Sequence, residues 1–427
     1  MQPTHAPLAG IRVVELTTAW AGPMAGRVLA YLGAEVIRIE AASRPCGWRH
    51  HSETRATFRY PNNDPGQRPY NRTALFNSQN VGKLAMTLDL KRPGGHATLV
   101  KLLAKADVLA SNFTPGTLAR LKLDHAHLRA VRPDIIVVEM PAYGTTGPMS
   151  NNTALGPTME MAAGMASMIG YREGGPPVYT GPSYMDAIGG FNGAAAVMTA
   201  LAYRRVTGRG QHVEMPQVEA AMHYIGAELL HAAATGKDPQ RNGNRVSWAA
   251  PHDTFAAQGT DEWVAIAVTD DRQWEALRGV IADPRLSAPS APEFSSLDGR
   301  LRAQDTLHAV ISDWTRARSK HDAAAQLQAA GVPAAPVQKA NDALASPYLA
   351  ARGFYTVLDH PDAGRHPYQG LPFHLDRTPA SATRAAPCLG EHTHAILSEL
   401  LQLSPEEIRA LEATGTIADT PPAANAA

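Results

Sequence analysis

The chain has 427 residues, of which 44% are hydrophobic and 18% charged, enough for two or three domains with hydrophobic cores. Lys and Arg together number 39, as do Asp and Glu, and this zero formal net charge excludes the strongly basic surface typical of nucleic-acid or anionic-membrane binding. The two cysteines form no CxxC motif and the first residues lack the apolar segment of a signal peptide, so we expect a cytoplasmic protein.

The N-terminal third alternates strand-like and helix-like segments. Short apolar runs favour strands, and amphipathic runs between them favour helices. These segments are, in chain order, residues 11–17, 27–34, 35–40, 84–90, 96–106, 107–113 and 134–140. Strands that alternate with helices indicate a parallel sheet covered by helices, so we expect an α/β fold with a Rossmann-like large domain.

Residues 44–72 interrupt this alternation. They are polar, rich in Arg and Pro, and long for a connection between elements. Loops of this kind are usually functional or mobile.

A long apolar segment, residues 187–203, follows a single acid, Asp186. It is shorter than the roughly 20 residues that span a membrane and contains Asn192, so we expect a buried helix. Later segments predict a second α+β region, beginning with a strand at 263–270, and a proline-rich crossing at 329–337. Ser404 and Glu407 form the capping box of a final helix.

These features predict three regions of the chain. Residues 1–225 would form the large domain, residues 226–335 a linker and a small α+β domain, and residues 336–427 a return to the large domain with a C-terminal helix and tail.

Several motifs that carry common chemistries do not occur in the sequence. There is no GxSxG, HExxH or GxxxxGK[ST] motif, and no complete GxGxxG after the first strand. The histidines near acids in HSETR and GEHTHA have no second cluster at metal-ligand spacing, so we expect no metal.

Asp186 has two interpretations. Its position at the head of a helix favours a capping role, because acids bind the free N–H groups there. The helix N-terminus would also lower the pKa of the carboxyl group, and Gly189 and Gly190 would let another backbone or a ligand approach. An ionised, partly desolvated carboxylate of this kind can act as a covalent nucleophile.

The pattern DxxGGxxGA from Asp186, followed by ALAYRRVTGRGQHVEM, resembles the class III coenzyme A transferases (the CaiB/BaiF family), which include formyl-CoA and carnitine CoA transferases. The resemblance runs almost end to end, through LAGIRVVELTTAWAGPMAGRVLAYLGAEVIRIE, KLAMTLDLK, DVLASNFTPGTLARL, RPDIIVVEMPAYGTTGP, GVPAAPV, ARGFY and LGEHTHAIL. It implies an interlocked dimer, Asp186 as nucleophile, and acyl-CoA and a carboxylic acid as substrates, without a permanently bound cofactor.

The resemblance also implies the residues that contact CoA. Trp20 and Ala21 would lie near the thiol end. The remaining contacts would lie along the nucleotide: Asn80, Lys83, Asn112, Phe113, Thr114 and Arg120. Arg and Lys suit phosphates and Phe113 can stack on adenine, whereas a solvated charge or core packing is the ordinary alternative for these residue types.

Some relatives in the family are racemases that use a histidine about thirty residues before the matching aspartate. This chain has no histidine between Gly144 and Gly170, and Gly156-Pro157 replaces a tyrosine-acid pair common in transferases. A glycine-run lid is also replaced, by RVSWAAPHDTFAAQ. Three functions compete: a CoA-transferase, a racemase or intramolecular isomerase, and a non-catalytic subunit of a hetero-oligomer.

The loop at residues 44–72 suggests the acceptor. It contains six arginines, with His50 and His51, against only Glu53 and Asp64. Folded over the site, Trp48, Arg49 and Arg72 could hold a second carboxylate, which would make the acceptor a dicarboxylate and succinyl-CoA a reasonable donor. A solvated basic loop is the equal alternative.

Overall fold

The computed structural model describes residues 6–49, 59–172, 174–181, 183–287 and 292–422. The chain forms two compact units. The larger contains Met1–Ala166, Tyr179–Asp238 and Ala351–Ala427, and the smaller contains Ser167–Val178 and Pro239–Ala350. We expected domain boundaries after residues 225 and 335; the units change over after Asp238 and Ala350, and residues 167–178 join the smaller unit. The functional division into domains stays a prediction.

The larger unit is built on a six-stranded sheet with the order β3-β2-β1-β4-β5-β6, and all its neighbours are parallel. Its strands are β1 (Arg12–Leu16), β2 (Glu35–Glu40), β3 (Leu84–Thr87), β4 (Val108–Ser111), β5 (Ile136–Glu139) and β6 (His212–Glu214). The expected Rossmann-like α/β fold is confirmed. Because β1 lies between β2 and β4, the order of the strands reverses there, and such a reversal is where parallel α/β sheets usually bind ligands.

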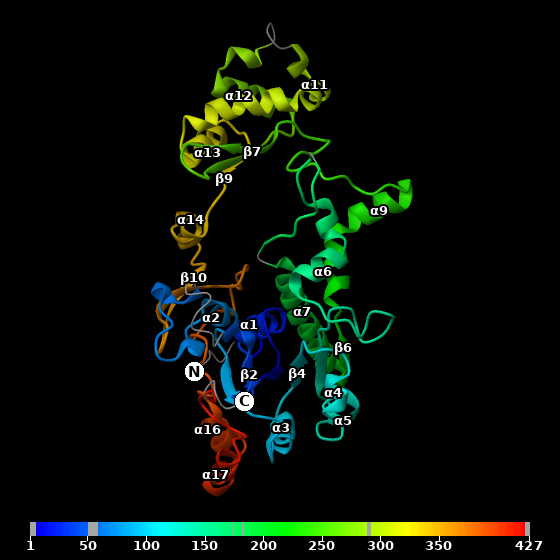
Figure 1. Ribbon diagram of the computed structural model, residues 1–427, viewed down its shortest axis with the longest axis vertical. Coiled ribbons are helices and arrows are strands. Elements are labelled where there is room, and N and C mark those ends of the chain that lie inside the picture. The colour runs from blue at the N-terminus through cyan, green and yellow to red at the C-terminus, as the bar shows by residue number, and fades with distance from the viewer. Residues whose placement is uncertain (1–5, 50–58, 173, 182, 288–291, 423–427) are drawn as a thin grey trace. The chain divides into compact units, whose positions relative to one another are not determined.

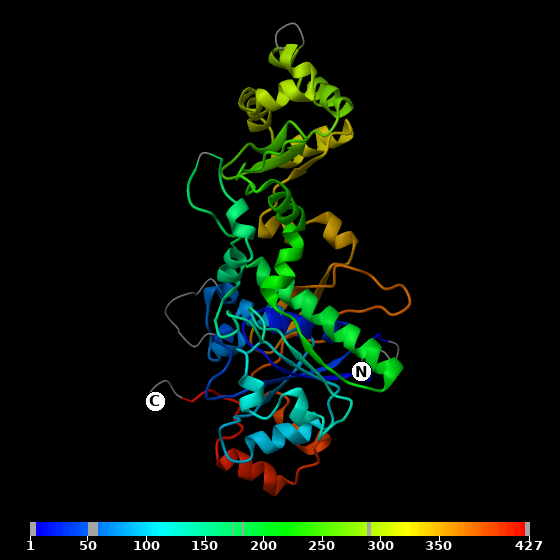
Figure 2. The same cartoon turned by 90° about the vertical axis from the view of Figure 1, so that its right-hand side faces the viewer.

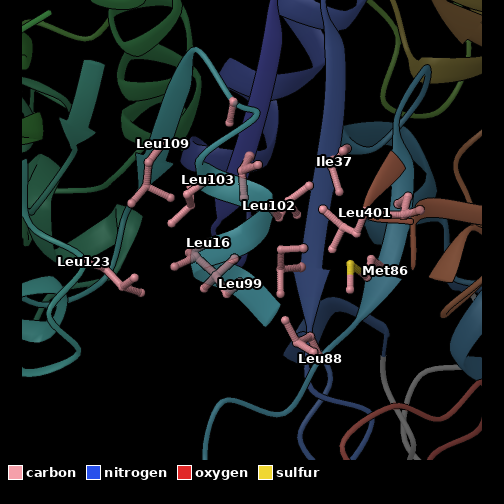
Figure 3. Close-up of a cluster of buried hydrophobic side chains, with 14 of the residues drawn as sticks. Leu16, Ile37, Met86, Leu88, Leu99, Leu102, Leu103, Leu109, Leu123 and Leu401 are labelled. Atoms are coloured by element: carbon pink, nitrogen blue, oxygen red, sulfur yellow. The ribbon is translucent and has the colours of Figure 1, made fainter. Parts of the chain in front are cut away.

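The two faces of this sheet are covered by different helices. Alternate side chains of a strand point to opposite faces, and in β1 Val13 packs with α1 (Ala21–Tyr31) and α7 (Tyr184–Thr207), whereas Val14 packs with α3 (Gly95–Leu103) and the C-terminal α17 (Pro405–Ala413). Figure 3 shows the second cluster, with Leu99 and Leu102 of α3 against Leu16 and Ile37 of the strands. This is a three-layer arrangement with two hydrophobic cores.

The other helices of the larger unit are short. They are α2 (Ala74–Gln79), α4 (Thr117–Arg120), α5 (His125–Leu128), α6 (Gly156–Ala162), α8 (Gln217–Met222), α9 (Gly226–Thr235) and α16 (Thr393–Ala395). An antiparallel hairpin of β10 (Tyr355–His360) and β11 (Gly364–Gln369) completes it. The predicted capping box is confirmed: the Ser404 hydroxyl accepts from the Glu407 N–H, and the Glu407 carboxylate accepts from the Ser404 N–H.

The smaller unit folds around its own core. Its antiparallel sheet has β8 (Trp263–Ala267) between β7 (His252–Ala256) and β9 (Ala334–Pro336). Its helices are α10 (Asp271–Ile281), α11 (Leu297–Arg302), α12 (Gln304–Arg316), α13 (Lys320–Ala329) and α14 (Ala340–Leu344), with α15 (Pro347–Ala351) at the boundary (Figure 1). Buried side chains such as Trp274 and Phe255 join the helices to the sheet. The predicted small α+β unit is therefore present.

Helix α7 differs from the buried helix that we expected. One face is buried, including Ile188, Gly190 and Val197, but Phe191 and Met198 on the other face are 38% and 41% exposed. None of the described helices is long and apolar enough to cross a membrane.

Candidate active site

Asp186 lies in the first turn of α7, with its carboxylate directed to a second helix. The N-cap residue of α7 is Ser183, in the left-handed region at φ 54°, and α7 has no side-chain cap. Instead, Oδ1 of Asp186 accepts a 3.3 Å hydrogen bond from the backbone N–H of Ala21, the first residue of α1. The capping interpretation is therefore wrong, because the carboxylate accepts its hydrogen bond from the first residue of α1 and not from an N–H group of α7.

The environment of Asp186 raises its pKa. Burial raises the pKa from 3.8 to about 6, against a smaller lowering by the hydrogen bond from Ala21. We expected the helix N-terminus to depress this pKa, and that expectation is wrong because desolvation disfavours the charged form more strongly. A carboxyl group with this pKa is mostly ionised at pH 7 and keeps little solvation to lose before it attacks a substrate.

Glycines let neighbouring elements close around the carboxylate. A Cβ atom on Gly156, at the start of α6, would lie inside 3.0 Å of Oδ2 of Asp186. A Cβ atom on Gly190 would also come inside 3.0 Å of the Met24 side chain in α1. Helices α1 and α7 pack side by side at this point (Figure 1 and Figure 2). Gly190 therefore admits the backbone of Ala21, as expected, whereas Gly189 lies against the side chain of Gln217.

Asn112 ties the carboxyl ends of β1 and β4 together. Its Oδ1 accepts from the Thr18 N–H at 2.8 Å, and its Nδ2 donates to the Thr18 carbonyl at 2.9 Å. This pair fixes the turn that carries Trp20 and Ala21 at the point where the strand order reverses. Trp20 packs against Trp48 with ring centroids 5.6 Å apart, and its indole Nε1 is buried without a hydrogen-bond partner among the described residues. The structure thus brings five predicted residues together: Asp186, Ala21, Asn112, Trp20 and Trp48.

Lys83 and Asn80 lie beneath this turn rather than beside a solvent-exposed ligand path. The Lys83 ammonium is fully buried and donates to Glu15 at 2.8 Å, to the Pro23 carbonyl at 2.7 Å and to Asn80 Oδ1 at 3.0 Å. Burial lowers the pKa of Lys83 to about 8 although Glu15 opposes this. All three donor hydrogens are engaged inside the protein, so Lys83 supports the first turn of α1 through Pro23.

A second buried ion pair engages Arg49. Its guanidinium donates to both carboxylate oxygens of Glu40 and to Oδ1 of Asn71, and neither charge of the pair is exposed by more than 4%. Burial alone would raise the pKa of Glu40, but Arg49 and Arg38 lower it to about 2. The donors of Arg49 that bond Glu40 are unavailable to a substrate carboxylate.

One signal in the sequence points to these buried charges, and the prediction did not use it. Glu15, Arg38 and Glu40 lie inside the apolar strands IRVVELT and EVIRIE, where an ionised side chain must find a partner. Arg38 bonds Glu15 at 3.1 Å and also both oxygens of Thr17, at the foot of the turn. We missed this network because its partners come from strands that are distant in the chain.

Arg72 also bonds within the protein, to the backbone carbonyls of Asp64 and Asp362. With Arg59, His366 and other residues, it lines a cavity of about 300 Å³ in which Asp186 takes no part. Arg55, His50, His51 and Glu53, which contributed to the predicted basic loop, lie outside the described residues.

The other predicted nucleotide contacts follow β4: Phe113 and Thr114 lie in the loop after it, and Arg120 is the last residue of α4. Arg120 and Thr114 are exposed and Phe113 is partly buried against the core. Arg120 donates to the Thr117 hydroxyl at 2.8 Å, and Thr117 in turn bonds Thr114 at 3.1 Å. These side chains can meet an external phosphate group. Among the described residues there is no group of three or more His, Cys, Asp and Glu that could hold a metal ion.

The chain resembles several CoA-transferases over most of its length. It is 29% identical over 412 residues to the succinyl-CoA–L-malate CoA-transferase alpha subunit of Chloroflexus aurantiacus, covering 95% of this chain and 91% of that protein. It is 32% identical over 349 residues to the acetyl-CoA:oxalate CoA-transferase of Acetobacter aceti, covering 81% and 84%.

A solved structure has the same fold. A CAIB/BAIF family protein from Brucella suis superposes with a TM-score of 0.81 at 27% identity, covering 93% of this chain and all of that one. CoA-transferase family III matches residues 8–393. The chain therefore belongs to CoA-transferase family III, and the resemblance seen in its motifs is confirmed.

Proposed function

We propose that this class III CoA-transferase moves CoA from an acyl-CoA donor to a carboxylic acid through covalent intermediates on Asp186. The observation that carries the proposal is the Asp186 carboxylate itself, which is desolvated, held by the Ala21 N–H, and placed beside the turn where the strand order reverses. A poorly solvated carboxylate that is still ionised at neutral pH is suited to attack a thioester.

The reaction proceeds by double displacement. Asp186 attacks the acyl carbon of the donor thioester, the C–S bond breaks, and an aspartyl anhydride and CoA thiolate form. The thiolate then attacks Cγ of Asp186, which releases the donor acid and leaves an aspartyl-CoA thioester. The acceptor carboxylate attacks this thioester, and the thiolate captures the acceptor acyl group from the new anhydride. Each step exchanges one activated acyl group for another.

The Ala21 N–H supports this chemistry by donating to the oxygen that carries developing negative charge. One such donor typically contributes a hundredfold or more to the rate of acyl transfer. For CoA, we propose that Arg120 and Thr114 meet phosphate oxygens and that Phe113 stacks on the adenine, while Trp20 and Asn112 lie nearer the thiol end. Lys83, Asn80 and Arg49 would not contact CoA directly. They would support the site through the buried ion pairs and hydrogen bonds that they form.

We further propose a dicarboxylic acceptor, with succinyl-CoA as a candidate donor. The names of the two relatives support this, because malate and oxalate are both dicarboxylic acids and one donor is succinyl-CoA. The basic character of the loop at residues 44–72 remains a second support, although Arg49 and Arg72 are engaged within the protein. A monocarboxylate of equal size should then lose about a hundredfold in kcat/KM. Equal rates for paired di- and mono-acids would contradict a dicarboxylate site.

The site gives less support to the alternative function, a racemase. Moving a proton between two faces of a carbon needs two opposed acid–base groups. The residue packed against Oδ2 of Asp186 is Gly156, which has no side chain to serve as the second group.

Assembly and location are also proposals. The relative named as an alpha subunit suggests that chains of this family can form hetero-oligomers, so a dimer of this chain and a pairing with a related chain are both retained. Both cysteines are free, which agrees with a cytoplasmic enzyme.

Isotope exchange tests the proposed reaction. With succinyl-CoA and labelled free succinate, a transferase moves label into the CoA ester only when both substrates are present. A racemase instead incorporates deuterium from D₂O at the α-carbon of a 2-methylacyl-CoA without any free acid. A non-catalytic subunit does neither. Absence of label exchange across a panel of short acyl-CoA and acid pairs would contradict the proposal.

A further inference from the structure

The two oxygens of the Asp186 carboxylate have different surroundings. Oδ1 accepts the hydrogen bond from the Ala21 N–H, at the start of α1. Oδ2 faces Gly156, at the start of α6, so closely that a Cβ atom on residue 156 would lie inside 3.0 Å of it. One oxygen is therefore fixed by a donor, and the other lies against the one residue type that has no side chain.

The backbone of residue 156 does not itself require glycine. Its φ angle lies outside the left-handed region, and it occupies the first position of a helix, where alanine is well tolerated. The atoms that a Cβ would meet are Oδ2 of Asp186 and the side chain of Ser183, the N-cap residue of α7. Glycine is needed here because of what lies beside it.

We propose that Gly156 is a positioning residue of the transfer reaction, which keeps open the space in which Oδ2 of Asp186 forms and loses its bonds. This inference rests on the proposed function. The Ala21 N–H holds Oδ1, which stays on Cγ as the carbonyl oxygen of both covalent intermediates. Oδ2 is the nucleophile, and its lone pairs need free volume on the Gly156 side.

The bonds balance in this assignment. Oδ2 bonds to the acyl carbon of the donor thioester as the C–S bond breaks, and CoA leaves as the thiolate. When the thiolate adds to Cγ, the Cγ–Oδ2 bond breaks and the donor acid departs with Oδ2 in its carboxylate. The acceptor acid later supplies the replacement oxygen, because its own C–O bond breaks when the thiolate takes the acceptor acyl group.

Gly156→Ala tests the inference, with Gly279→Ala as its matched control. A Cβ atom on Gly279, in α10, meets nothing within 4 Å. We expect Gly156→Ala to lower kcat at least a hundredfold, with less than a threefold change in the dissociation constant of a non-reacting CoA thioether, because the nucleotide site is untouched. Gly279→Ala should retain wild-type kcat. A Gly156→Ala enzyme within threefold of wild type in kcat would overturn the inference.

A second measurement does not depend on activity. If the new methyl group collides with the carboxylate, the melting temperature should fall more on Gly156→Ala in the wild-type chain than in an Asp186→Ala chain. The contact with Ser183 remains in both backgrounds, so only the difference reports on Asp186. Equal shifts in both backgrounds would overturn the inference. Should Gly156→Ala fail to fold, the same comparison holds: the double variant folds if the inference is correct and stays unfolded if it is not.

The Asp186→Ala enzyme separates this inference from the proposed function. Wild-type activity in the Asp186→Ala enzyme would contradict both the proposed function and the role of Gly156. An inactive Asp186→Ala enzyme beside a fully active Gly156→Ala enzyme would remove only the role of Gly156.

Discussion

At Asp186, burial and a backbone hydrogen bond act on the pKa in opposite directions. Burial raises the pKa and the hydrogen bond from the Ala21 N–H lowers it. The effect of burial is larger, so the pKa is about 6. The sequence identified the residue through the DxxGGxxGA pattern, but it gave the wrong direction for the pKa. The direction depends on how α1 and α6 enclose the carboxylate, and these helices begin 165 and 30 residues away.

Asp186→Asn should be inactive yet more stable than wild type at neutral pH. The folded pKa is raised above the ordinary 3.8, so the folded state binds the proton more tightly and the wild type loses stability as pH rises towards 6. Asparagine carries no charge, and its advantage in the free energy of unfolding should reach about 3 kcal/mol above pH 6 and shrink towards zero below about pH 4. Urea unfolding of both proteins across this range measures it. An advantage that grows towards low pH would contradict the raised pKa.

The pH dependence of catalysis has the same origin. Because the ionised carboxylate is the nucleophile, kcat/KM should fall about tenfold per pH unit below pH 6 and level off above it. Stopped-flow release of CoA at several pH values measures this profile. A midpoint near 4 would mean that the carboxylate is as well solvated as an ordinary aspartate.

At the scale of elements, buried charges hold the turn between β1 and α1. Glu15 bonds Lys83 and Arg38, and these two cations in turn bond Pro23 and Thr17 on either side of the turn. The strands themselves were predictable from their apolar runs. The short β6 and the β10–β11 hairpin were not, because β6 has three residues with none buried and β11 contains a proline, Pro367.

Lys83 and Arg120 should respond differently to substitution, although both resemble CoA contacts. Lys83→Met leaves Glu15 with one buried partner fewer, so we expect a loss of about 3 kcal/mol in the free energy of unfolding. Arg120→Ala removes an exposed side chain, so stability should change by less than about 0.5 kcal/mol while the KM for acyl-CoA rises about tenfold. Chemical unfolding measures the change in stability of the two variants, and steady-state kinetics measure the change in KM. A stable Lys83→Met enzyme with a raised KM would contradict this expectation and show that Lys83 contacts the nucleotide.

At the scale of the whole molecule, the larger unit leaves an apolar surface uncovered. None of the ten described residues of α9 is buried, and Leu230 on this helix is 73% exposed. Leu229, beside it on the same helix, is 46% exposed. Contiguous exposed apolar side chains usually mark an interface between chains.

We therefore expect an obligate dimer, or a pairing with a related chain, that does not dissociate on dilution. Leu230→Asp should produce aggregates or a destabilised monomer, because it places a charge in the surface that the partner covers. Glu275→Lys, on the exposed side of α10 in the smaller unit, is the control, because it changes a surface charge away from this helix. Light scattering tests the expectation, and a stable, folded wild-type monomer of 45.5 kDa would contradict it.

Trapping the covalent intermediate tests the central proposal most directly. The wild-type protein is incubated with succinyl-CoA, treated with hydroxylamine or borohydride, digested and analysed by mass spectrometry, with Asp186→Asn treated in parallel. We predict that an aspartyl hydroxamate or the reduced aspartyl derivative forms at Asp186 only when acyl-CoA is present, and that it is absent from the variant. Succinyl-CoA turnover with an unmodified Asp186 peptide, or equal modification of other carboxylates, would contradict covalent catalysis at this residue.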